Sequence, residues 1–175
     1  MKVKFVRPGQ TDLNSPIRKM QGISDYDLNS NGIKQAEETR DKLANEDFDI
    51  IISSPLKRAK HTAEIINEKK NVPLILDDKI KERNYGKLEG QLFKKEYCNL
   101  NFDFESIEGE SLEKYETRLK EFIQDIKEKY SDKKVLVVAH NGVISVLSCI
   151  LEGMPEDGNF ETRGIKNGEV KEFDI

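Results

Sequence analysis

Short apolar runs alternate along the chain with longer stretches in which apolar residues recur every three or four positions. The runs at 48–52 and 135–139 are nearly continuous, which is typical of strands buried on both faces of a parallel sheet. The pattern predicts these strands: one around Val3 and Phe5 that stops at Pro8-Gly9, Phe48–Ile52, Pro73–Leu76, Val135–Ala139 and, after a turn at Asn167-Gly168, Val170–Phe173.

The stretches between these runs predict helices. The first begins near Ser30-Asn31, and a second starts at Ser53-Ser54-Pro55, where a serine N-cap precedes a proline, and ends near Lys69-Lys70. Ser111 caps a third helix with one apolar stripe, and residues 142–151 are apolar nearly all round, as in a buried helix. The stripe of the third helix contains Leu112, Tyr115, Leu119, Phe122, Ile123 and Ile126.

The segment from Asp77 to Gly109 has aromatic residues but poor periodicity, so we expect a loop-rich insertion with short helices. Elsewhere the alternation of strands and helices predicts βαβ units, and therefore an α/β fold with a mostly parallel sheet covered by helices on both faces. No repeat or low-complexity linker divides the sequence, so we expect one domain over residues 1–175.

In such a sheet, ligands bind outside the carboxyl ends of the strands. Arg7 follows the first predicted strand, Arg58 follows the second, and His140 follows the fourth. Two arginine forks and the positive end of the helix near Pro55 suit a phosphate dianion, and a mostly protonated His140 would add to them. Glycine at 142 would allow the backbone to approach the ligand closely, and Glu82 could protonate the leaving oxygen of an ester.

Taken one at a time, these residues have simpler interpretations. Each arginine could form a surface ion pair, His140 could be a satisfied structural residue, and Glu82 could be a surface carboxylate. Their joint placement at strand ends favours a phosphate site.

Composition narrows the classes of partner. Charged residues make up 35% of the chain and hydrophobic residues 36%, with a net charge of −4 and no block of one sign, so we expect no nucleic-acid binding. No run approaches a membrane span and no signal peptide opens the sequence, so we expect a cytoplasmic protein without membrane partners. Cys98 and Cys149 are too far apart to indicate a zinc site.

Six segments in order resemble the histidine phosphatase superfamily, in its phosphoglycerate mutase-like branch. They are Val6–Thr11 with Asn14; Gln21-Gly22 through Gln35-Ala36; Ser53 through Ala63; Glu82–Gly86 with Glu89-Gly90; Gly109–Ser111 with Arg118; and Ala139–Gly142. The resemblance implies the three-layer α/β sandwich of that family and a ping-pong phosphoryl transfer through a phosphohistidine. It implies neither a metal nor a cofactor.

The resemblance also implies roles for individual residues. Arg7, Arg58 and His140 would hold the transferred group, and Glu82 would donate a proton. The expected phosphate- and substrate-binding set is Arg7, Gln10, Asn14, Gln21, Gly22, Arg58, His140 and Asn141. The expected ligand is a small phosphorylated metabolite or inorganic phosphate.

The position of the nucleophilic histidine holds Pro8. Proline offers no side-chain lone pair, and losing a nucleophile has cost another enzyme about 10⁶ in kcat. The other histidines, His61 and His140, are not expected to replace it, because His61 suits a surface position and His140 would have to leave its binding role.

Three hypotheses remain open. In the first, the chain is a phosphatase of small monoesters that is weak or inactive as written. In the second, it is a pseudophosphatase that binds a phosphorylated metabolite or regulates a partner. Alternatively, Pro8 reflects a strain variant or a deliberate substitution, because a single base change converts a histidine codon to proline. The sequence identifies neither the substrate, which segment 77–109 would select, nor the oligomeric state.

Overall fold

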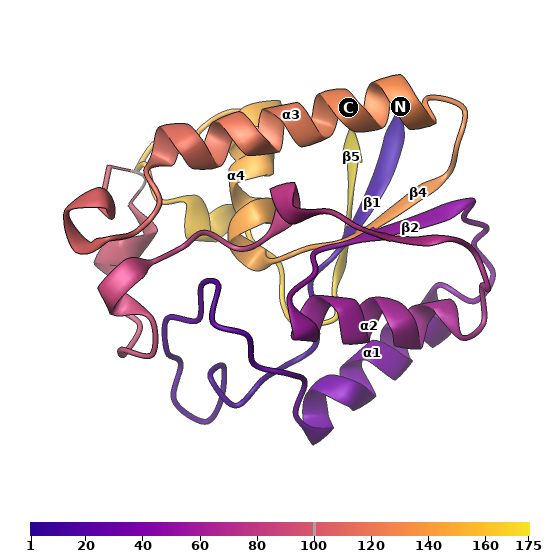
Figure 1. The fold of residues 1–175 in the computed structure, drawn as a ribbon, viewed down its shortest axis with the longest axis horizontal. Coiled ribbons are helices and arrows are strands. Elements are labelled where there is room, and N and C mark those ends of the chain that lie inside the picture. Colours follow the sequence, from indigo (N-terminus) through magenta and orange to yellow (C-terminus); the bar gives the residue numbers. More distant parts are fainter. Residues whose placement is uncertain (100) are drawn as a thin grey trace.

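The computed structural model describes residues 1–99 and 101–175. Within them, five strands form one sheet in the order β3-β2-β4-β1-β5 (Figure 1). The strands are β1 (Lys2–Val6), β2 (Ile50–Ser53), β3 (Leu74–Leu76), β4 (Val135–Val138) and β5 (Val170–Asp174). The first four run parallel to their neighbours, whereas β5 is antiparallel to β1 at one edge.

Helices cover both faces of this sheet. They are α1 (Ser30–Lys42), α2 (Lys57–Asn67), α3 (Leu112–Tyr130) and α4 (Asn141–Glu152), with α1 and α2 on the face opposite to α3 (Figure 1). Along β4, Val135 and Val137 pack in the cluster that contains α3 and α4, while Leu136 and Val138 pack with α2. The predicted three-layer α/β fold with a mostly parallel sheet is therefore confirmed.

Local sequence explains where α3 begins and which face it buries. The Ser111 hydroxyl accepts a hydrogen bond from the Lys114 amide at 3.2 Å, as expected of an N-cap. Five of the six predicted stripe residues are buried, and Leu112 is partly buried at the end of the stripe. Phe122 meets Phe5 of β1 edge-on, with ring centroids 6.5 Å apart, which packs the helix against β1.

The prediction for α2 was wrong at its start and close at its end. The helix begins at Lys57 rather than at the serines, and its N-cap residue Leu56 makes no side-chain cap. The Ser54 hydroxyl accepts a hydrogen bond from the Leu56 amide at 3.3 Å and is also 2.8 Å from a ring nitrogen of His140, so it contacts both the segment before α2 and a distant partner. The helix ends at Asn67, and the chain turns through Asn71 at φ +51°.

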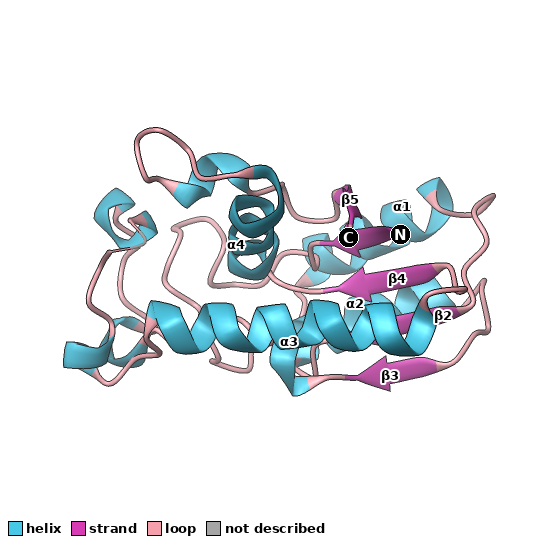
Figure 2. Ribbon diagram, turned by 90° about the horizontal axis from the view of Figure 1, so that it is seen from above, coloured by secondary structure: helices cyan, strands magenta, loops and turns pink. Residues whose placement is uncertain are grey.

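The insertion predicted between Asp77 and Gly109 is confirmed where the structure describes it. It contains short 3-10 helices at Asp78–Ile80, Gly86–Leu88, Lys95–Cys98 and Glu105–Ile107. Aromatic residues of the insertion form a separate cluster around Met20, Tyr97 and Phe104. In Figure 2 the arrowheads of β3 and β4 point toward the side where the long loops gather. The insertion thus lies beyond the carboxyl ends of the parallel strands. In the described residues, no helix is both long and apolar enough to cross a bilayer.

Candidate functional site

A cavity opens at the carboxyl edge of the sheet, enclosing about 750 Å³ with the solvent at its mouth included. The structure brings together there most of the residues that the sequence singled out. They are Arg7, Pro8, Asn14, Gln21, Gly22, Arg58, Glu82, His140 and Asn141. The rule that ligands bind at strand ends therefore located a real cavity.

Arg7 reaches the cavity from the residue directly after β1. Its main-chain amide donates to the Glu169 carbonyl at 3.0 Å, and its Nη1 donates to the Ile165 carbonyl at 2.6 Å. Burial, followed by the charge of Arg18, lowers the pKa of Arg7 to about 10. The guanidinium still carries its proton at neutral pH, in a place where that charge is costly.

Arg58 lies in the first turn of α2 and is 4% exposed. Its Nη1 donates to the Ser24 carbonyl at 2.9 Å and its Nη2 to the Gly22 carbonyl at 2.7 Å. Burial lowers the pKa of Arg58 to about 10, even though Glu82 and other acidic groups raise it. Like Arg7, this buried cation donates to carbonyl oxygens.

Gly22 must be glycine to hold Arg58 in this way. Its φ is +52°, and a Cβ there would lie 2.1 Å from Oε1 of Glu89. The Glu89 carboxylate accepts hydrogen bonds from the amides of Ile23, Ser24 and Tyr85. This carboxylate therefore fixes the loop whose carbonyls bind Arg58.

His140 precedes α4 and is 2% exposed. Its Nε2 lies 2.8 Å from the Ser54 hydroxyl. Burial, and then the charges of Arg58, Arg118 and Arg7, lower the pKa of His140 well below 6.5. This direction is opposite to the expectation of a mostly protonated ring, because burial and the charges of three guanidiniums disfavour the imidazolium.

Glu82 faces His140 across the start of α4. Its Oε1 accepts hydrogen bonds from the Tyr115 hydroxyl at 2.9 Å and the Arg83 amide at 3.0 Å, and its Oε2 accepts from the Gly142 amide at 3.0 Å. A Cβ at Gly142 would lie 2.2 Å from Oε1 of Glu82. The glycine thus makes room for this carboxylate, whereas the sequence suggested that it makes room for a ligand.

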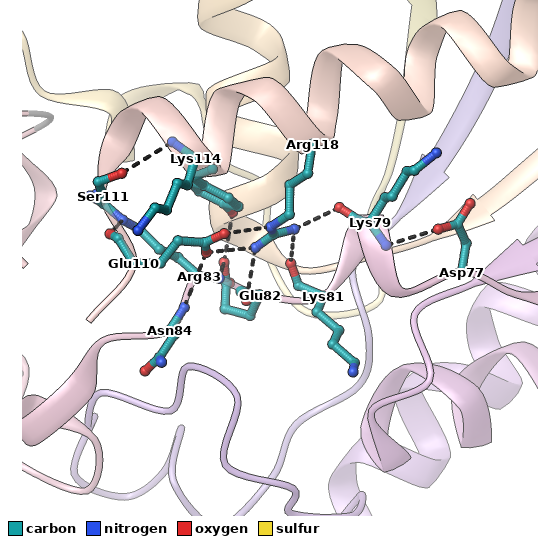
Figure 3. A network of polar contacts seen from close by, with 11 residues as sticks. Asp77, Lys79, Lys81, Glu82, Arg83, Asn84, Glu110, Ser111, Lys114 and Arg118 are labelled. Carbon is teal, nitrogen blue, oxygen red and sulfur yellow. Dashed lines mark hydrogen bonds and ion pairs between the residues drawn. The ribbon is translucent and has the colours of Figure 1, made fainter. Parts of the chain in front are cut away.

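Arg118 of α3 holds the segment that carries Glu82 (Figure 3). It donates to both carboxylate oxygens of Glu110, at 2.7 and 2.8 Å. It also donates to the carbonyls of Lys79, Lys81 and Glu82, at 2.6, 2.8 and 3.2 Å. One side chain thus ties three main-chain oxygens to α3, which orients Glu82 without Arg118 lining the cavity.

The backbone around Pro8 is held from both sides. The Pro8 carbonyl accepts a hydrogen bond from Asn167 Nδ2 at 2.9 Å, and the Gly9 amide donates to Thr62 Oγ1 at 3.2 Å. A Cβ at Gly9 would lie 2.2 Å from the carbonyl oxygen of Gly32, so α1 touches the chain here backbone to backbone. Pro8 itself is buried and lines the cavity.

Gln10 does not line the cavity, contrary to its place in the predicted binding set. Its side-chain oxygen accepts hydrogen bonds from Asn29 at 3.3 Å and Asn31 at 3.4 Å, at the start of α1. It therefore stabilises the approach to a helix. His61, as expected, lies outside the cavity, with Nδ1 2.9 Å from a carboxylate oxygen of Asp27.

The other predicted amides line the cavity with part of their hydrogen-bonding capacity already used. Gln21 Nε2 donates to the Thr11 hydroxyl at 2.7 Å, Asn14 accepts from the Thr11 amide at 3.0 Å, and Asn141 accepts from the Ile165 amide at 3.0 Å. Each side-chain amide keeps further donors or acceptors for a ligand.

Part of the cavity lining comes from residues that the sequence analysis did not assign to the site. They are Arg18, Lys19, Met20, Tyr85, Phe93, Tyr97, Phe160, Glu161 and Asn167. The Arg18 guanidinium stacks on the Phe93 ring, 3.5 Å from its centroid, and pairs with Glu161. These residues come from separate loops without periodicity, so no local pattern could have grouped them.

Comparison with known proteins identifies the family. The model of the histidine phosphatase superfamily (branch 1) matches residues 3–175. Uncharacterized phosphatase PhoE of Bacillus subtilis is 42% identical over 155 residues, covering 88% of this chain and 79% of that protein. Phosphoserine phosphatase 1 of Hydrogenobacter thermophilus is 33% identical over 164 residues, covering 88% of this chain and 77% of that protein.

Solved structures share the fold. The crystal structure of the alpha-ribazole phosphatase from Shigella flexneri matches with a TM-score of 0.85 and 24% identity, covering 100% of this chain and 91% of that one. At this identity the likeness bears on the fold alone. The family itself is shown by the match over nearly the whole chain.

Proposed function

Because this chain belongs to the histidine phosphatase superfamily, we propose that its cavity binds the phosphate group of small phosphate monoesters. We further propose that it hydrolyses them weakly or not at all, because Pro8 occupies the position of the nucleophile. Arg7, Arg58 and His140 would contact the phosphate, and Glu82 would face the leaving oxygen. The name of the Hydrogenobacter relative, a phosphoserine phosphatase, supports a small monoester as ligand.

The observation that carries this proposal is a pair of cations without anionic partners, of which Arg58 is buried and Arg7 is partly buried. Arg7 and Arg58 both line the cavity, and their hydrogen bonds go to carbonyl oxygens. In residues 1–99 and 101–175, neither guanidinium forms an ion pair with a carboxylate. Burying an unpaired charge is costly, so a dianion that contacts both guanidiniums would offset that cost.

The first chemical step is the one affected by Pro8. In the family's reaction a histidine nitrogen attacks phosphorus, the ester oxygen leaves with a proton from the acid, and water then cleaves the phosphohistidine. Proline has no lone pair with which to begin this sequence. The remaining groups can hold the ester and polarise it, but attack then falls to water, which nothing on the Pro8 side chain activates.

A second candidate is a pseudophosphatase that holds a phosphorylated metabolite without turnover. The unpaired guanidiniums support this role equally well. Glu82 favours recent loss of activity or an altered residue over a long-standing binding role, because a pure phosphate binder needs no proton donor. Here the donor keeps three hydrogen bonds that hold its carboxylate in place.

The deciding experiment compares the chain as written with its Pro8→His variant. We expect inorganic phosphate or vanadate to bind the Pro8 protein at millimolar concentration or better, while hydrolysis of p-nitrophenyl phosphate stays near background. Pro8→His should restore turnover and give an acid-labile phosphoenzyme. Pro73→His, at an exposed position before β3, adds a histidine far from the cavity and should change nothing.

Two results would contradict the proposal. If Pro8→His stays inert while the chain as written hydrolyses esters, the role assigned to position 8 is wrong. If neither phosphate nor vanadate binds, the two guanidiniums do not form an anion site.

A further inference from the structure

Ser54 contacts His140 at a buried position behind the cavity. Its hydroxyl is 2.8 Å from Nε2 of His140, and it also accepts a hydrogen bond from the Leu56 amide at 3.3 Å. Ser54 is 0% exposed and does not line the cavity. The neighbouring Ser53 is equally buried, but its hydroxyl donates to the Ser54 carbonyl at 2.9 Å and does not reach the imidazole.

The contacts of the Ser54 hydroxyl fix the direction of its hydrogen bond. A hydroxyl has one hydrogen to donate and two lone pairs that accept, and the Leu56 amide uses one lone pair. Among its contacts within the described residues, Nε2 of His140 alone can accept the hydroxyl hydrogen. If Nε2 carried its own hydrogen, the hydroxyl hydrogen would be buried without an acceptor, which is costly.

A ring that accepts at Nε2 and is neutral carries its hydrogen on Nδ1. Neutrality follows from burial and from Arg58, Arg118 and Arg7, which together keep the pKa of His140 well below 6.5. In the described residues, every fully buried side-chain nitrogen or oxygen other than Ser145 Oγ has a hydrogen-bond partner. Nδ1 of His140 has no such partner in the described residues, so it is not fully buried, and because His140 lines the cavity, Nδ1 opens onto that cavity.

We propose that Ser54 is a positioning residue whose hydroxyl holds His140 in the Nδ1–H form, so that Nδ1 donates a hydrogen bond to a phosphate oxygen. This proposal rests on the proposed function in one respect, that the cavity binds phosphate. His140 would then act as a neutral donor beside the two guanidiniums, and phosphate binding at neutral pH would not require the ring to take up a proton.

The chain contains two histidines, which makes the tautomer directly measurable. His61 lies outside the cavity, so the His61→Asn variant leaves His140 as the sole imidazole signal. In two-bond ¹⁵N–¹H spectra at neutral pH, we expect Nδ1 to be the protonated nitrogen and Nε2 the unprotonated one. Added inorganic phosphate should shift Nδ1 more than Nε2 while the ring stays neutral.

Variants of the two adjacent serines separate positioning from general packing. In the His61→Asn background, Ser54→Ala should weaken the Nδ1–H preference and reduce phosphate affinity about tenfold. Ser53→Ala, a matched change one residue away, should leave both unchanged. Ser54→Cys, which restores a weak donor of similar size, should lie between Ser54→Ala and the parent protein.

An Nε2–H ring or an imidazolium in the parent protein at neutral pH would overturn the proposal. So would a Ser54→Ala spectrum identical to that of Ser53→Ala. If the Nδ1–H form is found but phosphate neither binds nor shifts Nδ1, the positioning by Ser54 stands, and both the donor role toward phosphate and the proposed function fail.

Discussion

At the scale of single residues, this site depends on two arginines, the buried Arg58 and the partly buried Arg7, that form no ion pair with a carboxylate in the described residues. A rule about strand ends was enough to pick out Arg7 and Arg58 from the sequence, because position after a strand determines which edge a residue reaches. The sequence could not predict their protein partners, which are carbonyls from distant loops. Those partners hold each fork in place while leaving its charge for a ligand.

Replacing Arg58 by lysine should show that the planar fork matters as well as the charge. Lysine keeps the charge but cannot reach the carbonyls of Gly22 and Ser24 and a phosphate together. We expect Arg58→Lys to weaken phosphate binding roughly tenfold to a hundredfold, as measured by calorimetry at fixed ionic strength. The matched control is Arg40→Lys, whose guanidinium pairs at the surface with Asp41 and Glu68. Equal affinity of the two variants would argue against a phosphate contact by Arg58.

Residue-scale predictions from the sequence failed where a distant group decided the outcome. His140 was expected to be protonated, but its three guanidinium neighbours come together only in the folded chain. Gln10 was assigned to the phosphate site by its place in a motif, yet its side-chain oxygen accepts hydrogen bonds from Asn29 and Asn31 at the start of α1. Neither outcome has a local sequence signature.

At the scale of elements, periodicity located the strands and helices, and α3 shows why it worked. Its apolar stripe and its serine cap are both local properties, so the sequence contains the whole explanation. The start of α2 was placed too early: Ser54 lies before the helix, where its hydroxyl accepts from the Leu56 amide and also contacts a histidine 86 positions away. Helices and strands could be predicted where the side chains that define them make their contacts within the same segment.

The link between α3 and the Glu82 segment can be broken by one substitution. Arg118→Met removes a side chain that donates to Glu110 and to three carbonyls, and it leaves the Glu110 carboxylate partly buried. We expect a loss of about 2–4 kcal/mol in the free energy of unfolding, measured with urea.

Two further variants test the cause of that loss. Lys114→Met lies one turn earlier on α3, where the side chain is exposed, and should cost little. Adding Glu110→Gln to Arg118→Met should recover part of the loss, since it removes the charge left without a partner. A double variant that is as unstable as the sum of the single ones would show that the pair is not coupled.

At the scale of the whole molecule, the buried neutral imidazole makes stability depend on pH. When the chain unfolds, His140 regains an ordinary pKa near 6.5, whereas burial and nearby guanidiniums hold its folded pKa well below that value. Below pH 6.5 the unfolded chain therefore binds a proton that the folded chain does not, and stability falls as pH falls.

This dependence can be isolated with His140→Gln. Between pH 6.5 and 5, in phosphate-free buffer, His140 should contribute up to about 1.4 kcal/mol per pH unit to the decline in unfolding free energy. The variant should lack this part of the slope, although its stability at pH 8 will differ from that of the parent. Identical slopes for the parent and His140→Gln would mean that the folded ring titrates normally.

The backbone contact between Gly9 and Gly32 restricts which position in this stretch could carry a nucleophilic side chain. Any side chain at position 9 would collide with α1, and Arg7 is already occupied on the other side of Pro8. Under the role proposed for position 8, neither adjacent residue could supply an attacking atom in its place. Within residues 7–9, position 8 is therefore the one where a nucleophilic side chain would disturb neither the contact with α1 nor the hydrogen bonds of Arg7.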